Sequence, residues 1–363
     1  MVDVLSKIPL VGWGPIITIA AIAVSCLIIA VLLWRNHRVW RWVFVFLFFV
    51  FGVGTAADAV NNRFAYYDNV AQLAGLPTYP TVDVGGGGNA SGGGGAPVEQ
   101  HPDGAVTKIT IPDNNSHFGS FDANVWLPPQ YFSDPRAHFP VLLLIHGNPG
   151  SNNDWLNGSR AAETGLAAAK ANHPVILVFP TVLRDGFTGD TLCLDTESQG
   201  NAETYLLKDV LPTIDNNFRT SVNVKQRAIG GLSMGGYCAL NLGLKHPDVF
   251  SVALDFSGET TPVADTLPGG LSQLFGANGQ QKADANNPEK YWSTLDGSKG
   301  PAIWMDVGTS DTAILAAMKT LAPQLQSKGF TVEFHTRPGA HDFITFGNAF
   351  ADAMPWASAR LYQ

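Results

Sequence analysis

The stretch Gly230-Gly231-Leu232-Ser233-Met234-Gly235-Gly236 decides the fold of this 363-residue chain. An apolar run at residues 227–229 precedes it, and small and apolar residues recur with helical spacing over residues 237–244. This order predicts a strand, a tight turn and a helix. Within the turn, Gly231-x-Ser233-x-Gly235 is the pattern of a nucleophile elbow, in which the serine takes a strained backbone conformation and its neighbours must lack bulk.

The predicted elbow would also place Ser233 where it can react. A serine hydroxyl is a weak nucleophile until a base takes its proton, and this turn lifts Ser233 clear of the sheet, where a histidine can reach it. It aims the first backbone N–H groups of the following helix, Met234 foremost, at the place where an oxyanion would form. The alternative is a glycine-rich turn with a solvated serine, because G-x-S-x-G also occurs by chance. The residues elsewhere in the chain distinguish between these two interpretations.

The composition points to membrane segments and away from nucleic acid. The formal net charge is −8, only 14% of residues are charged and the mean hydropathy is +0.07, which is high for a soluble enzyme. The net negative charge of the chain gives no indication of a nucleic-acid partner. The three cysteines, Cys26, Cys193 and Cys238, show no C-x-x-C spacing, and no H-E-x-x-H motif occurs. We therefore expect no metal and no cofactor.

Two apolar runs near the N-terminus predict two transmembrane helices. Residues 15–34 carry no charge and are long enough to cross a hydrocarbon core of about 30 Å. Residues 43–57 span if Arg41 extends to the interface, where Trp40 and Trp42 would sit. Basic residues concentrate between the runs, so the positive-inside rule keeps that short loop in the cytoplasm and turns both ends outward.

Ala57-Asp58-Ala59 leaves one alternative open, since its A-x-A form behind an apolar run resembles a signal-peptide cleavage site. With either interpretation the remaining chain lies outside the cytoplasmic membrane. The glycine-rich tract at residues 85–95 predicts a flexible tether. We thus expect a membrane anchor over residues 1–60, a juxtamembrane segment and linker over 61–104, and a catalytic domain over 105–363.

From residue 105 onward the pattern becomes α/β. Strands are predicted at residues 105–111, 121–127, 141–146, 175–179, 227–232, 252–256, 302–307 and 331–335. Helices are predicted at residues 159–171, 202–218, 234–244, 312–327 and 343–353. The alternation implies right-handed crossovers and a mostly parallel central sheet covered by helices on both faces.

In such a sheet the functional side chains follow the carboxyl ends of strands. After the strand that ends at His146, the loop Gly147-Asn148-Pro149 can turn backbone N–H groups into the site. Asn148 is the expected second oxyanion donor, because Pro149 has no N–H to offer. His146 is a rival base, but its place before a tight turn favours a role in holding the loop.

Two later strand ends supply an acid and a base. Asp311 follows one strand end and can orient a histidine, although it could instead cap the next helix. Asp306 is its rival but lies inside the apolar run. His341 opens the final helix and can reach Ser233, whereas His335 lies within a strand and is expected to be structural. The order serine, acid, histidine is that of α/β-hydrolases.

Four motifs together resemble the esterase family of α/β-hydrolases that includes esterase D-type S-formylglutathione hydrolases, feruloyl and enterochelin esterases, and envelope mycolyltransferases. They are Gly-Leu-Ser-Met-Gly-Gly at 231–236, His146-Gly147-Asn148, residues 201–206 at a helix start, and residues 338–343 with His341. The resemblance covers about residues 105–360. It implies Ser233 as nucleophile, His341 as base and Asp311 as acid, with Met234 and Asn148 N–H groups as the oxyanion hole.

The expected function is a membrane-anchored serine esterase acting outside the cytoplasm. One alternative is an acyltransferase that passes the acyl chain to a sugar or lipid hydroxyl, and another is an envelope scaffold without catalysis. The expected ligand is an ester or acyl-lipid, and the sequence identifies no protein partner. Cys193 and Cys238 should both lie near the carboxyl end of the sheet, so an extracytoplasmic disulfide between them is one hypothesis, which the sequence leaves open.

Overall fold

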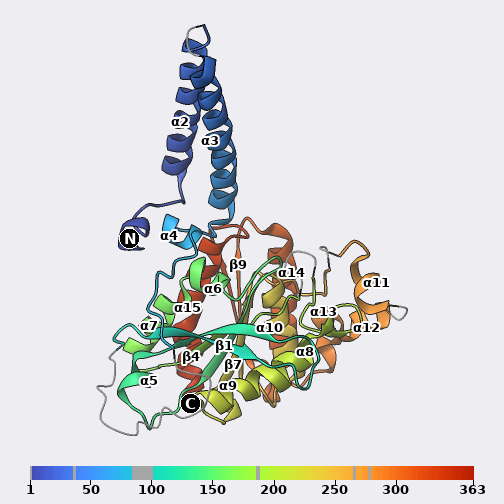
Figure 1. Ribbon diagram of the computed structural model, residues 1–363. Coiled ribbons are helices and arrows are strands. Elements are labelled where there is room, and N and C mark those ends of the chain that lie inside the picture. The colour runs from blue at the N-terminus through green and yellow to red at the C-terminus, as the bar shows by residue number, and fades with distance from the viewer. Residues whose placement is uncertain (1, 36–37, 84–100, 185–188, 265–266, 277–278) are drawn as a thin grey trace. The chain divides into compact units, whose positions relative to one another are not determined.

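The computed structural model describes residues 2–35, 38–83, 101–184, 189–264, 267–276 and 279–363 (Figure 1). The chain divides into two compact units. The first comprises Met1–Thr78 and Asp342–Ile344, and the second comprises Tyr79–His341 and Thr345–Gln363. The glycine tract predicted as a tether, residues 85–95, lies outside the described residues.

The first unit is a helical hairpin with short helices at its open end. Its elements are α1 (Val2–Leu5), α2 (Trp13–Leu32), α3 (Arg38–Phe64) and α4 (Val70–Leu73). α2 and α3 lie side by side (Figure 1), and both are long and apolar enough to cross a membrane by length and composition. α3 is longer than the predicted 43–57, because its helix continues through the polar residues that end the hydropathy signal.

Hydrogen bonds join the residues before α2 to the residues at the end of α3 and just after it. The Leu10 N–H donates to the Asp68 carbonyl at 2.9 Å, and the Gly12 N–H donates to Asn62 Oδ1 at 2.6 Å. Asn61 Nδ2 donates to the carbonyls of Leu10 and Tyr67 at 3.2 and 2.9 Å. The start of α2 and the end of α3 therefore lie at the same end of the hairpin.

The second unit is built on one eight-stranded sheet of order β1-β2-β4-β3-β7-β8-β9-β10. The β1–β2 and β2–β4 pairs are antiparallel, and the other pairs are parallel. The strands are β1 (Ala105–Ile111), β2 (Phe121–Leu127), β3 (Val141–Ile145), β4 (Ile176–Phe179), β7 (Arg227–Leu232), β8 (Val252–Phe256), β9 (Ala302–Gly308) and β10 (Val332–Arg337). β5 (Asp195–Thr196) and β6 (Gly200–Asn201) form a separate small hairpin.

Helices pack on both sides of this sheet (Figure 1), as the alternating pattern predicts. They are α5 (Pro129–Ser133), α6 (Asp154–Asn157), α7 (Ala161–Lys170), α8 (Ala202–Thr204), α9 (Leu211–Asn217), α10 (Met234–Lys245), α11 (Gly270–Phe275), α12 (Gly279–Ala285), α13 (Pro288–Tyr291), α14 (Thr312–Ser327) and α15 (Phe343–Leu361). β3, β4 and β8 are buried throughout, so the core runs through the middle of the sheet.

Two helices of the second unit also differ from the predictions. The predicted helix 202–218 is α8, a π-helical turn at Tyr205–Val210 and α9 in succession. The predicted helix 343–353 continues as α15 to Leu361, through Pro355. Proline usually stops a helix because it lacks an N–H. Here the second half of α15 still buries Met354, Ala357 and Leu361, and that packing is invisible in a local pattern.

Candidate active site

Ser233 is the single residue between a strand and a helix. β7 ends at Leu232, α10 begins at Met234, and Ser233 itself has φ 56° and ψ −125°. The turn requires glycine on both sides. A Cβ at Gly231 would lie 1.9 Å from the Gly235 carbonyl oxygen, and a Cβ at Gly235 would lie 2.3 Å from the Ile145 carbonyl oxygen. The strained backbone that the G-x-S-x-G pattern predicts is present at Ser233, because a residue with a side chain rarely adopts a positive φ.

Ser233, His341 and Asp311 come together in hydrogen-bonding geometry. His341 Nε2 lies 2.8 Å from Ser233 Oγ, and His341 Nδ1 lies 2.6 Å from Asp311 Oδ2. The Asp311 side chain is 13% exposed and that of His341 36%, so the carboxylate is more shielded from solvent than the imidazole. The imidazole packs against Phe346 in a T-shaped contact, with the ring centroids 5.1 Å apart.

Two loops hold the acid and the histidine in register. The Thr309 N–H donates to the Arg337 carbonyl at 2.8 Å, and the Ser310 N–H donates to the Gly339 carbonyl at 2.8 Å. The loop after β9 is thus bonded by its backbone to the loop after β10. Asp311 and His341 follow these loops directly, so their separation is set by main-chain hydrogen bonds.

Asp306, the rival acid, has another role. Arg337 donates to both of its oxygens, from Nε at 2.8 Å and from Nη2 at 2.5 Å, and Asp306 is 1% exposed. These hydrogen bonds raise the pKa of the Arg337 guanidinium. The pair ties β9 to β10 just before the loops that carry Asp311 and His341. The rival His335 stacks on Trp304 with ring centroids 3.9 Å apart, a packing contact at the edge strand.

The loop after β3 lies against the elbow, as the oxyanion interpretation requires. A Cβ on Gly147 would lie 3.3 Å from Ser233 Cβ, so the main chain approaches Ser233 at van der Waals range. Asn148 follows, joined to Pro149 by a cis peptide bond. On the other side, Met234 is the first residue of α10, where backbone N–H groups have no intrahelical carbonyl partner.

The disulfide and one further acid complete the surroundings. Cys193 and Cys238 are joined by a disulfide, with Cα atoms 5.6 Å apart. Sequence reasoning missed Glu259, which follows the carboxyl end of β8, the strand between those that lead to Ser233 and Asp311. Burial raises the pKa of the Glu259 carboxyl, the negative charges of Asp190 and Asp311 act in the same direction, and the His341 charge opposes them. The strand-end rule that selected the triad would also have found Glu259.

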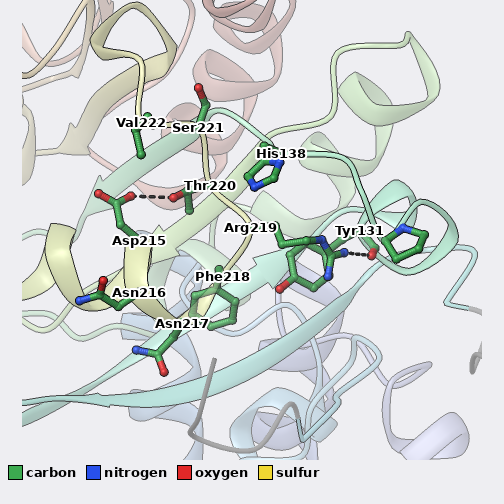
Figure 2. A pocket seen from close by; sticks show the side chains of 11 residues that line it. Tyr131, His138, Asp215, Asn216, Asn217, Phe218, Arg219, Thr220, Ser221 and Val222 are labelled. Carbon is green, nitrogen blue, oxygen red and sulfur yellow. Dashed lines mark hydrogen bonds between the residues drawn. The ribbon is translucent and has the colours of Figure 1, made fainter. Parts of the chain in front are cut away.

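A groove of about 520 Å³ lies elsewhere on the domain (Figure 2). Its walls are Tyr131, Pro135, His138 and residues 215–222. These residues precede β3 and β7, so the groove lies at the amino ends of the parallel strands, opposite Ser233. Arg219 lies over the Tyr131 ring at 3.8 Å and donates to the Tyr131 carbonyl. No predicted site residue lines this groove.

This sheet, with a serine on a strand–turn–helix elbow, has the α/β-hydrolase fold. The family described as "Putative esterase" matches residues 118–357, and the chain belongs to that family. Both results confirm the expected fold class and the resemblance seen in the motifs.

Relatives and solved structures agree with this assignment. An uncharacterised protein of Corynebacterium glutamicum is 31% identical over 270 residues, which cover 71% of this chain and 62% of that protein. Esterase Rv1288 of Mycobacterium tuberculosis is 29% identical over 244 residues, which cover 61% and 52%. The chain therefore spans less than two thirds of the length of these relatives.

Two solved structures show the same fold. A ferulic acid esterase superposes with a TM-score of 0.61 at 22% identity, covering 71% of this chain and 98% of that one. An S-formylglutathione hydrolase from Agrobacterium tumefaciens superposes with a TM-score of 0.56 at 20% identity, covering 72% and 97%.

Proposed function

We propose that this protein is a membrane-anchored serine esterase that hydrolyses carboxylic esters outside the cytoplasm through Ser233, His341 and Asp311. The observation that carries the proposal is the hydrogen-bonded chain from Ser233 Oγ to His341 Nε2 at 2.8 Å and from His341 Nδ1 to Asp311 Oδ2 at 2.6 Å. Membership of the esterase family supports the choice of ester as the bond attacked.

The geometry supports a two-step acyl-enzyme mechanism. Ser233 Oγ attacks the ester carbonyl carbon while His341 Nε2 takes the hydroxyl proton, and the Asp311 carboxylate stabilises the imidazolium through Nδ1–H. The carbonyl oxygen becomes an oxyanion that accepts hydrogen bonds from the Met234 and Asn148 N–H groups. His341 then protonates the leaving alkoxide. Water then attacks the acyl-enzyme as His341 takes its proton, and His341 returns that proton to Ser233 Oγ as the acyl–oxygen bond breaks and the acid leaves.

The hairpin supports the membrane part of the proposal. α2 has 20 residues, which at about 1.5 Å each cross a hydrocarbon core of about 30 Å. Trp13 at one end of α2 is 72% exposed. At the loop end the Arg41 guanidinium lies 4.7 and 5.5 Å from the ring centroids of Trp34 and Trp42. This arrangement suits a cation and aromatic rings at a lipid–water interface.

Labelling with a fluorophosphonate tests the catalytic part. Detergent-solubilised wild type should label and turn over p-nitrophenyl esters of increasing chain length, and Ser233→Ala should do neither. Ser251→Ala is the matched control, because Ser251 precedes β8 at the opposite end of the sheet, where its hydroxyl bonds the Lys225 carbonyl at 2.9 Å. If wild type neither labels nor turns over, the serine is not activated and the proposal is wrong.

Products and topology test the remaining parts. Analysis of products from a labelled acyl donor, with and without sugar acceptors, separates free acid from transferred ester. A hydrolase yields the acid under both conditions, whereas transfer to the sugar would replace hydrolysis with acyltransferase activity. Alkaline phosphatase fused after residue 104 should be active in cells. Activity only for a fusion in the loop between α2 and α3 would reverse the proposed orientation.

A further inference from the structure

His146 is a neutral imidazole with both nitrogens occupied. The Val182 N–H donates to His146 Nε2 at 3.1 Å, so Nε2 carries no proton. The proton is therefore on Nδ1, which donates to the Gly147 carbonyl at 2.7 Å. His146 is fully buried, and this burial lowers the pKa of its imidazole and keeps it uncharged. His146 thus connects the loop that carries Asn148 to the segment that follows β4.

That segment is in turn tied to the disulfide. Thr191 Oγ1 donates to the Val182 carbonyl at 3.0 Å and accepts from the Cys193 N–H at 3.1 Å. The Leu194 N–H donates to the Thr191 carbonyl at 2.9 Å. Val182, Thr191 and Cys193 have no exposed surface. Water therefore does not compete for these hydrogen bonds, and each restrains the positions of its two partners.

The disulfide closes the connection onto the nucleophile helix. Cys238 lies in the second turn of α10, whose first residue is Met234, and it is fully buried. A continuous path therefore runs from Met234 along α10 to Cys238, across the disulfide, through Thr191 and Val182, and through His146 to the loop of Asn148. The two proposed oxyanion donors are the two ends of this path.

We infer that Thr191, the Cys193–Cys238 disulfide and His146 form a buried brace that sets the spacing between the Asn148 and Met234 N–H groups. The inference rests on the proposed function. An oxyanion hole stabilises charge only when both donors lie about 2.7–3.1 Å from the oxygen of the transition state. The brace residues do not touch the substrate. They are positioning residues, which act through the backbone of the two donors.

Thr191 offers a matched pair of variants. Thr191→Val keeps the shape of the side chain but removes the hydroxyl that bonds both Val182 and Cys193, whereas Thr191→Ser keeps the hydroxyl. In the full-length, detergent-solubilised protein, Thr191→Val should lower kcat about tenfold or more with KM within about twofold, because ground-state binding does not use the oxyanion hole. Thr191→Ser should stay within about twofold of wild type in both constants.

A second variant tests the inference independently if Thr191→Val does not fold. The Cys193→Ala/Cys238→Ala double variant removes the disulfide without leaving a buried thiol, and its kcat should fall by a similar factor. The inhibition constant of an aryl boronic acid, which mimics the tetrahedral oxyanion, should rise in proportion to the loss of kcat in both variants. A purely structural role would lower the melting temperature without this proportionality.

The outcomes are distinguishable. If wild-type turnover depends on Ser233, but both variants keep the wild-type kcat and boronic acid affinity, the brace is refuted and the esterase proposal stands. If wild type shows no Ser233-dependent turnover, the proposed function fails and the inference fails with it. Loss of kcat with proportional loss of boronic acid affinity, restored in Thr191→Ser, is the result that supports the brace.

Discussion

Gly235→Ala should lower kcat about 100-fold while leaving the protein folded. The added Cβ would lie 2.3 Å from the Ile145 carbonyl oxygen and 2.6 Å from that of His146. Cβ atoms in proteins essentially never approach a neighbour more closely than 3.0 Å, and contacts are unstrained from 3.4 Å, so β3 and α10 must separate by 0.7 to 1.1 Å. β3 leads into the loop of Asn148, and α10 begins with Met234. The whole displacement therefore falls between the two proposed oxyanion donors.

The expected loss of catalytic rate follows from that displacement. A misplacement of about 1 Å at a reacting centre costs about 10²-fold in rate, which is about 2.7 kcal/mol of transition-state stabilisation. Overpacking should also lower the free energy of unfolding by about 1–3 kcal/mol. We expect kcat for p-nitrophenyl esters to fall about 100-fold, KM to change little, and the far-ultraviolet circular dichroism spectrum to match wild type.

Gly243→Ala is the matched control in the same helix. Its Cβ would meet the Ala253 side chain at 2.8 Å, a tight contact in the interior of α10, well away from Ser233. It should lower stability but leave kcat within about twofold. The reasoning is refuted if folded Gly235→Ala keeps more than about a third of wild-type kcat, or if Gly243→Ala loses as much activity at equal stability.

Three further predictions concern stability. Removing the disulfide with Cys193→Ala/Cys238→Ala should lower the free energy of unfolding by about 4 kcal/mol, because it frees a loop with a sequence separation of 45; equal urea midpoints for variant and wild type would contradict this. Asp306→Ala leaves the Arg337 guanidinium partly buried without its principal carboxylate and should cost about 3 kcal/mol or more in the same assay; a cost below about 1 kcal/mol would argue against a structural ion pair. Burial raises the pKa of Asp255 well above its ordinary value, so the folded state keeps a proton that the unfolded state loses as pH rises above about 4. Wild-type stability relative to Asp255→Asn should therefore fall between pH 4 and 7, by at most about 1.4 kcal/mol per pH unit, and parallel stability curves would show that Asp255 is ionised in the fold.

Much of the sheet could be predicted because local signals bound its strands. β1, β2, β7 and β8 have the predicted limits. Glycine or proline stands beside the apolar runs of β1 and β2, and serine directly follows those of β7 and β8. α11, α12 and α13, between β8 and β9, were not predicted. They are short, and many of their residues are polar. A window of 11–18 residues cannot detect helices of four to seven residues.

The candidate site was predictable for a different reason. A parallel sheet brings residues far apart in the chain to one edge, so three strand ends sufficed to nominate Ser233, Asp311 and His341. The same rule could not rank Asp306 below Asp311 with certainty. That ranking depends on Arg337, 31 residues away in sequence, which bonds both Asp306 oxygens. Sequence therefore nominates the candidates, and the hydrogen-bond partners of each decide among them.

His146 shows why this distinction matters for mechanism. From sequence it competes with His341 for the role of base, because both follow apolar strands. In the structure His146 Nε2 accepts from Val182 and its Nδ1 donates to Gly147, so no nitrogen is left to take a proton from Ser233. His341 Nε2 instead faces the hydroxyl. With His341 as the base, His341→Ala should abolish fluorophosphonate labelling together with turnover. His146→Gln should retain labelling at a reduced rate, because it impairs the placement of the oxyanion loop and leaves the base intact.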